Sequence, residues 1–136
     1  MSFESRFVAS LRDQYANDVK RKELTDRAVS FINDRVEKFG ESVEDFIPAT
    51  YGDIQVYSDY PEDELFSEIR IQGHVLGFKR DKNSIEVFKI IGEDRQRIDI
   101  ISPLVSEGNW VCHEGGFFNE HKFDEYLKVV FEEVIS

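Results

Sequence analysis

Apolar residues recur at helical spacing over the first forty positions of the chain. One stripe consists of Phe3, Phe7, Val8, Leu11 and Tyr15, and a second consists of Leu24, Ala28, Phe31, Ile32, Val36 and Phe39. The step from Val19 to Leu24 rotates the stripe by roughly 140° at 100° per residue. The intervening sequence DVKRKEL contains neither Gly nor Pro. The pattern therefore predicts two helical segments, separated by a break or continuous as one long helix that contacts two surfaces, with Gly40 as the stop.

The pattern becomes irregular between residues 41 and 66. Ser42 followed by Asp45 resembles a capping box, which predicts a single helical turn that Pro48 ends. Asp53 to Tyr57 alternates in polarity and predicts a first strand. The segment SDYPEDELF then places Pro61 where a turn or a brief helix can begin.

From Glu68 onward the alternation is typical of strands. Four such runs follow one another: EIRIQGHVLGFKR, SIEVFKIIG, RIDIISPLV and NWVCH. Short polar segments separate them, as in an antiparallel meander. Within the first run, Gly73 and Gly77 indicate a bulge, a strong bend or a place where another group packs close to the backbone.

The last element predicted is a helix. Asn119 is a good N-cap residue, and an apolar stripe follows it with Phe123, Tyr126, Leu127, Val130, Phe131 and Val134. Each amphipathic helix must bury its stripe against another layer. The sequence thus predicts an α+β fold with two N-terminal helices, an antiparallel meander of about five strands, and a C-terminal helix packed on one sheet face. At 136 residues, this is one domain over residues 1–136.

The net charge of −11 is distributed unevenly along the chain. Residues 41–68 contain nine acidic and no basic side chains. Such a surface repels nucleic acid and anionic membranes, and it attracts a basic protein or a cation. No run of 18 apolar residues occurs, and charges interrupt the N-terminal segment. We therefore expect a cytoplasmic protein with no membrane segment.

The rare residues concentrate in WVCHEGGFFNEHKFDEY, residues 110–126, which contains the lone Cys and two of the three His. Zinc sites require three or four converging ligands in spacings that this stretch lacks, so His113 and His121 are only weak metal candidates. Cys112 at a strand end is typical of a small buried apolar residue. The Gly-Gly pair is typical of a turn. The sequence assigns no catalytic residue and no cofactor.

The acidic region is the strongest functional signal in the sequence. Its proposed binding residues are Glu44, Asp45, Asp59, Tyr60, Glu62, Asp63 and Glu64. Acidic charge steers the encounter with a basic partner, and Tyr supplies rigid contact area. The leading hypothesis is a non-catalytic protein-binding module, such as an inhibitor, immunity-type or regulatory partner of a basic protein. The alternative is an enzyme or a small-ligand or metal-binding domain with a pocket between the sheet and the C-terminal helix. A third hypothesis is a homodimer joined through an exposed sheet face or edge.

Overall fold

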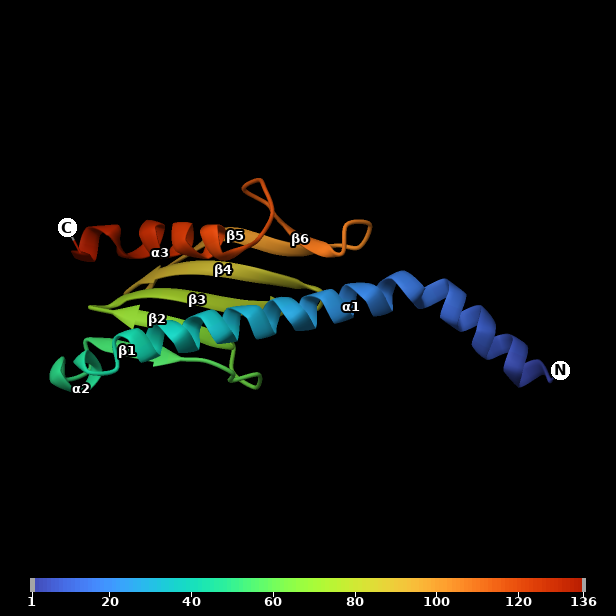
Figure 1. The fold of residues 1–136 in the computed structure, drawn as a ribbon, viewed down its shortest axis with the longest axis horizontal. Coiled ribbons are helices and arrows are strands. Elements are labelled where there is room, and N and C mark those ends of the chain that lie inside the picture. The colour runs from blue at the N-terminus through green and yellow to red at the C-terminus, as the bar shows by residue number, and fades with distance from the viewer. Residues whose placement is uncertain (1, 136) are drawn as a thin grey trace.

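In the computed structural model, which describes residues 2–135, two helices lie on one face of a six-stranded antiparallel sheet (Figure 1). The strands follow one another in space in the order of the sequence, β1 to β6. The elements are α1 Phe3–Ser42, α2 Phe46–Ala49, β1 Ile54–Tyr57, β2 Ser67–Ile71, β3 His74–Asp81, β4 Ser84–Ile91, β5 Asp94–Leu104, β6 Asn109–Cys112 and α3 Glu120–Ile135. The predicted α+β class and antiparallel meander are confirmed.

The N-terminal pattern forms one helix of 40 residues. The sequence left open a break near residues 19–24, and the backbone continues through it because no Gly or Pro interrupts the hydrogen-bonded ladder. The helix also passes Gly40 and ends at Ser42. A Cβ at position 40 would lie 3.2 Å from Cγ1 of Val56, so the glycine lets α1 approach β1 closely.

The predicted capping box at Ser42 is wrong. The Ser42 hydroxyl donates a hydrogen bond back to the carbonyl of Lys38, 3.0 Å away, and so belongs to the last turn of α1. The short helix α2 begins at Phe46 and includes Pro48, which the sequence had placed at its end. Its first residues carry no side-chain cap, consistent with an element of only four residues.

The meander contains six strands because the run EIRIQGHVLGFKR is a hairpin. Gln72 and Gly73 both adopt positive φ, of 50° and 81°, and form a two-residue turn between β2 and β3. Gln is uncommon at the first of these positions, where Asn or Asp is the usual signal. Gly77 has the predicted close neighbour: a Cβ there would lie 2.7 Å from Cδ1 of Leu65.

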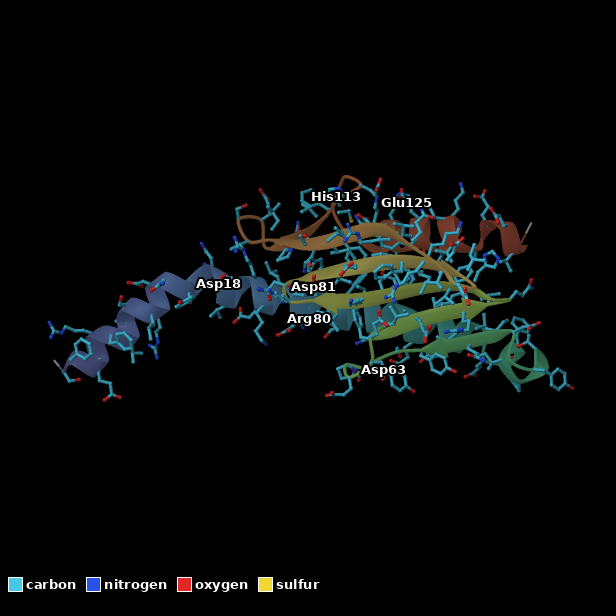
Figure 2. All side chains as sticks on the ribbon, turned by 180° about the vertical axis from the view of Figure 1, so that it is seen from behind. Asp18, Asp63, Arg80, Asp81, His113 and Glu125 are labelled. Carbon is cyan, nitrogen blue, oxygen red and sulfur yellow. The ribbon has the colours of Figure 1, made fainter. Side chains whose placement is uncertain are left out.

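The core lies between the sheet and the two helices. From α1 it receives Ala28, Ile32 and Val36, and from α3 Phe123, Tyr126, Val130 and Phe131. The Phe78 ring of β3 stacks on Phe123 at a centroid distance of 5.9 Å. Figure 2 shows the opposite face of the sheet, which no helix of the described residues covers. Asn119 accepts a hydrogen bond from the backbone N–H of Lys122 and so caps α3 as predicted.

Candidate binding surfaces

The loop between β1 and β2, residues 58–66, has a fixed backbone. Asn33 of α1 accepts hydrogen bonds through Oδ1 from the N–H of Asp59, at 3.0 Å, and from the hydroxyl of Ser67. Within the loop, the N–H of Tyr60 donates to the carbonyl of Phe66 at 3.0 Å. The loop therefore presents its side chains without first having to become ordered, which lowers the entropic cost of binding.

A small pocket lies beside this loop. Tyr57, Tyr60, Asp63, Leu65 and Glu68 line a space of about 180 Å³. The two tyrosine rings meet edge to face with their centroids 6.0 Å apart, and both side chains are exposed. Aromatic faces beside a carboxylate are the chemistry that recognises a cationic side chain.

The structure separates the acidic residues that the sequence grouped together. Glu44 and Asp45 lie in the turn before α2, beyond one end of β1, whereas Asp59 to Glu64 lie in the loop beyond the other end (Figures 1 and 2). Glu64 also forms an ion pair with Arg95 at 2.5 Å, and the Arg95 guanidinium lies 4.2 Å from the centroid of the Phe88 ring. Among the acids of the loop, Asp63 is the one that lines the pocket, together with Glu68 of β2.

The rare residues of WVCHEGGFFNEHKFDEY occupy different environments. Cys112 is buried at the end of β6, whereas His113 and His121 are exposed. His121 contacts Glu125 at 3.1 Å, one helical turn away. Over residues 2–135, no three His, Cys, Asp or Glu side chains are grouped so that they could hold a metal ion.

Sequence reasoning missed a buried polar cluster around Asp99. Its Oδ1 accepts hydrogen bonds from the N–H groups of Ile100 and Glu114, and its Oδ2 accepts one from the hydroxyl of Tyr126. A bulge in β5 at Ile98 precedes it, since Arg97 and Asp99 pair with consecutive residues of β4. No sequence motif marks this arrangement.

The Asp99 cluster has a structural role, and its phenol and thiol are both held in their protonated forms. Burial, followed by the hydrogen bond to Asp99, raises the pKa of the Tyr126 phenol well above its usual range, so the phenol remains a donor. Burial also raises the pKa of the Cys112 thiol to about 11, and its Sγ lies 3.5 Å from the Tyr126 oxygen. A protonated thiol is a poor nucleophile at neutral pH. The cluster ties the turn after β6 to β5 and α3.

A different feature dominates the outline of the molecule: the N-terminal half of α1 projects beyond the sheet (Figure 1). We refer to residues 3–23 as the arm. Every residue of the arm is exposed. Its large apolar side chains are Phe3, Phe7, Val8, Leu11, Tyr15 and Val19.

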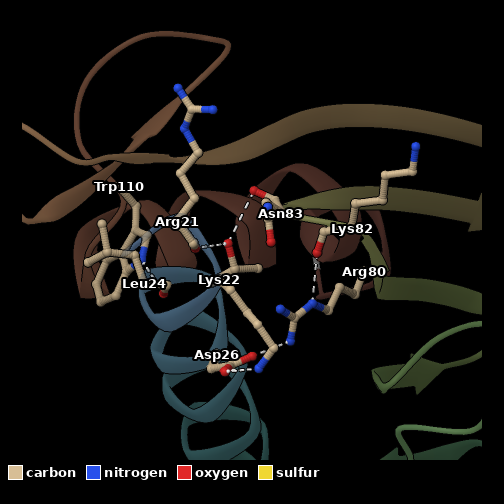
Figure 3. Close-up of polar contacts among 9 residues, drawn as sticks. Arg21, Lys22, Leu24, Asp26, Arg80, Lys82, Asn83 and Trp110 are labelled. Carbon is tan, nitrogen blue, oxygen red and sulfur yellow. Dashed lines mark hydrogen bonds and ion pairs between the residues drawn. The ribbon is translucent and has the colours of Figure 1, made fainter. Parts of the chain in front are cut away.

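The root of the arm is held firmly where α1 meets the hairpin of β3 and β4 (Figure 3). Trp110 Nε1 donates a hydrogen bond to the carbonyl of Leu24 at 2.7 Å. The Thr25 hydroxyl donates to the Arg21 carbonyl at 2.8 Å and lies 3.1 Å from the Asn83 carbonyl. Arg80 pairs with Asp26 at 2.7 Å. The direction in which the arm leaves the domain is therefore defined by contacts with three other elements.

An apolar groove lies at the other end of α1. It opens between the C-terminal ends of α1 and α3, over the edge of the sheet at β1 and β2, and has a volume of about 690 Å³. Its apolar lining includes Phe39, Val43, Ile54, Ile71, Leu127 and Phe131. We refer to it as the groove. Its size is within the range of ligand-binding pockets, and its wall is almost wholly apolar.

Comparison with models of protein families, with curated proteins and with solved structures finds no match for this chain. Among the helices of residues 2–135, none combines the length and apolar character required to cross a membrane.

Proposed function

We propose that the protein is a non-catalytic protein-binding module whose loop pocket receives a basic side chain of a partner protein. The observation that supports this proposal is the pocket formed by Tyr57, Tyr60 and Asp63 in a loop whose backbone Asn33 fixes. An inhibitor, immunity-type or regulatory partner of a basic protein would use such a surface. The partner's Lys or Arg would place its charge near Asp63 and its apolar stem against the tyrosine rings.

The charge of the chain supports a basic partner. The segment 41–68 that contains the pocket carries nine acidic side chains and no basic one. Exposed charges of this kind accelerate association and lose influence as salt is added. The tyrosines would supply the part of the affinity that salt does not remove, because aromatic contact area is not screened.

A peptide-binding experiment tests this proposal. Short oligolysine, oligoarginine and oligoglutamate peptides are titrated into the protein in a calorimeter at low and moderate salt. We expect the basic peptides to bind and oligoglutamate not to bind. The double variant Tyr60→Ala with Asp63→Asn should weaken binding by about 10-fold, since it removes a cation–π contact and an ion pair.

The matched control is Glu44→Gln with Asp45→Asn, which neutralises two exposed acids beyond the other end of β1. We expect it to change the affinity by less than about 2-fold, because these charges lie far from the pocket and are screened. Equal losses in the two double variants would mean that the peptides respond only to net charge, and the pocket would then have no role.

A further inference from the structure

The arm carries an apolar surface that its own domain cannot cover. Phe3 is 72% exposed, Phe7 51% and Val19 55%, whereas Ile32 and Val36 of the same helix are fully buried. These arm side chains are exposed because this part of α1 projects beyond the sheet (Figure 1). An isolated helix segment of this length is marginally stable in water, and an exposed apolar surface of this kind marks an interaction site.

The groove is the complementary feature of the same chain. It is concave and apolar, and it lies between two helices, an arrangement that accepts the apolar face of a third helix. Phe3, Phe7 and Leu11 recur every four residues on the arm, the spacing of anchors that enter such a groove. Because the arm and the groove lie at opposite ends of α1, a molecule cannot fill its own groove with its own arm (Figure 1).

We propose that the arm of one copy of the chain occupies the groove of a second copy, and that the second arm occupies the first groove. The proposal is independent of the loop pocket and goes beyond the function proposed above. The dimensions of α1 support the reciprocal arrangement. The 40-residue helix has its midpoint between residues 22 and 23, so the arm and the remaining half of α1 are nearly equal in length, about 30 Å each.

A two-fold axis near that midpoint would lay the two helices antiparallel. The tip of each arm, at Phe3 and Phe7, would then lie beside the partner's Phe39–Val43 segment, which forms one wall of the groove. This contact is the same on both copies, so it closes into a dimer and does not propagate into a fibre. A reciprocal contact of two arms and two grooves would bury on the order of 1,500 Å², a standard size for a stable interface.

Charge favours the arm as the segment that enters the groove. The arm contains five basic and four acidic side chains, a net charge of +1, so the remainder of the chain carries −12. Two such acidic bodies repel each other, and the arm is the part that can approach a second copy without that repulsion. The groove lining carries one acid, Glu132, and one base, Lys128, and the exposed Glu41 belongs to its wall, beside which Arg6 of an incoming arm would lie.

Sedimentation equilibrium and light scattering of the full chain test the assembly. We expect a dimer of twice 15.9 kDa that dissociates on dilution. The variant Phe3→Glu with Phe7→Glu should weaken dimerisation by at least about 100-fold, because ionised carboxylates cannot be buried in an apolar groove. Both positions are exposed and lie outside the loop pocket, so peptide binding by that pocket should not change.

The control variant is Ala9→Glu with Ala16→Glu, which adds the same two charges on the opposite side of the arm, at about 100° per residue. It should dimerise within about 3-fold of the unmodified chain. A monomer at all concentrations would overturn the proposal, as would a dimer insensitive to Phe3→Glu with Phe7→Glu. Binding of a fatty acid in the groove of a chain that stays monomeric would also overturn it.

Cross-linking distinguishes an arm in a groove from two arms paired together. Single variants Phe3→Cys and Val43→Cys are prepared, and the native Cys112 is buried and does not interfere. We expect an oxidised mixture of the two variants to form the mixed disulfide dimer, with little cross-linking of Phe3→Cys alone. Efficient cross-linking of Phe3→Cys with itself, and none with Val43→Cys, would assign the arms to each other and overturn the groove as their site.

Discussion

The two halves of α1 share one hydrogen-bonded helix and differ in almost everything else. In the C-terminal half, Ala28, Ile32 and Val36 are at most 1% exposed and belong to the core. In the arm, apolar residues of equal or larger size lie in solvent. The two halves have the same helical backbone, so backbone conformation does not explain their difference in burial. The difference arises because the sheet and α3 cover only the C-terminal half of α1, and the arm projects beyond them (Figure 1).

This comparison shows that one helix can serve two purposes. Burial of the C-terminal half stabilises the domain through apolar area removed from water, at roughly 25 cal/mol per Å². The arm contributes no such area to the isolated domain. Its apolar residues are explained by an interaction outside the domain, and the contacts of Leu24, Thr25 and Asp26 hold it in a fixed direction.

The largest expected effect comes from matched truncations in the two halves. Ile32→Ala should lower the free energy of unfolding by about 2–4 kcal/mol, because it leaves a cavity at a fully buried site. Leu11→Ala should lower it by less than about 1 kcal/mol, because an exposed leucine gains little from folding. Urea denaturation followed by circular dichroism measures both, at a concentration low enough to keep the chain monomeric.

Equal losses in the two variants would contradict the comparison, because they would mean that the arm packs on its own domain. Val36→Ala provides a second buried site, and Val8→Ala a second exposed one. The two buried truncations should lower the free energy of unfolding by similar amounts, and both losses should be clearly larger than those of the two exposed truncations.

Periodicity was sufficient to predict most of the fold. The apolar stripe after Asn119 predicted α3 and its N-cap, and the alternating runs predicted the antiparallel meander. The hairpin at Gln72 and Gly73 was missed, because its first turn residue is not the usual Asn or Asp. Both N-terminal apolar stripes were visible in the sequence. Which stripe the sheet would cover was not, because that depends on contacts with distant residues such as Trp110.

The candidate sites were harder to predict than the fold. The acidic segment looked continuous along the chain, yet β1 separates Glu44 and Asp45 from the loop of Glu62 and Asp63. The pocket beside Tyr60 depends on Tyr57 of β1 and Glu68 of β2, which pair across the ends of the loop. The groove draws its lining from both helices and from β1 and β2, so no single stretch of sequence encodes it.

A smaller effect is expected at the junction of the two halves. Trp110→Phe removes the hydrogen bond to the Leu24 carbonyl and retains an aromatic ring beside Phe31 and Phe118. It should cost about 1–2 kcal/mol, since it removes a part-buried hydrogen bond that joins β6 to α1. Hydrogen exchange at the amides of residues 20–28 should accelerate more than exchange in α3. Uniform acceleration throughout the domain would instead mean that Trp110 acts only through the core.

The smallest expected effect is a pH dependence at the same junction. The hydrogen bonds from Arg80, and next from Lys22, lower the pKa of Asp26 below its usual range. A carboxyl whose pKa is lower in the folded state stabilises the fold above the ordinary aspartate pKa of about 3.9, and that stability is lost as the pH falls below it. Because the Asp26 side chain is 44% exposed, solvent screening limits the contribution to less than about 1 kcal/mol. Asp26→Asn should therefore lower stability slightly at pH 7 and have little effect near pH 2, as urea denaturation at the two pH values would show. A loss that persists at pH 2 would mean that the carboxylate charge is not what joins the arm to the hairpin of β3 and β4.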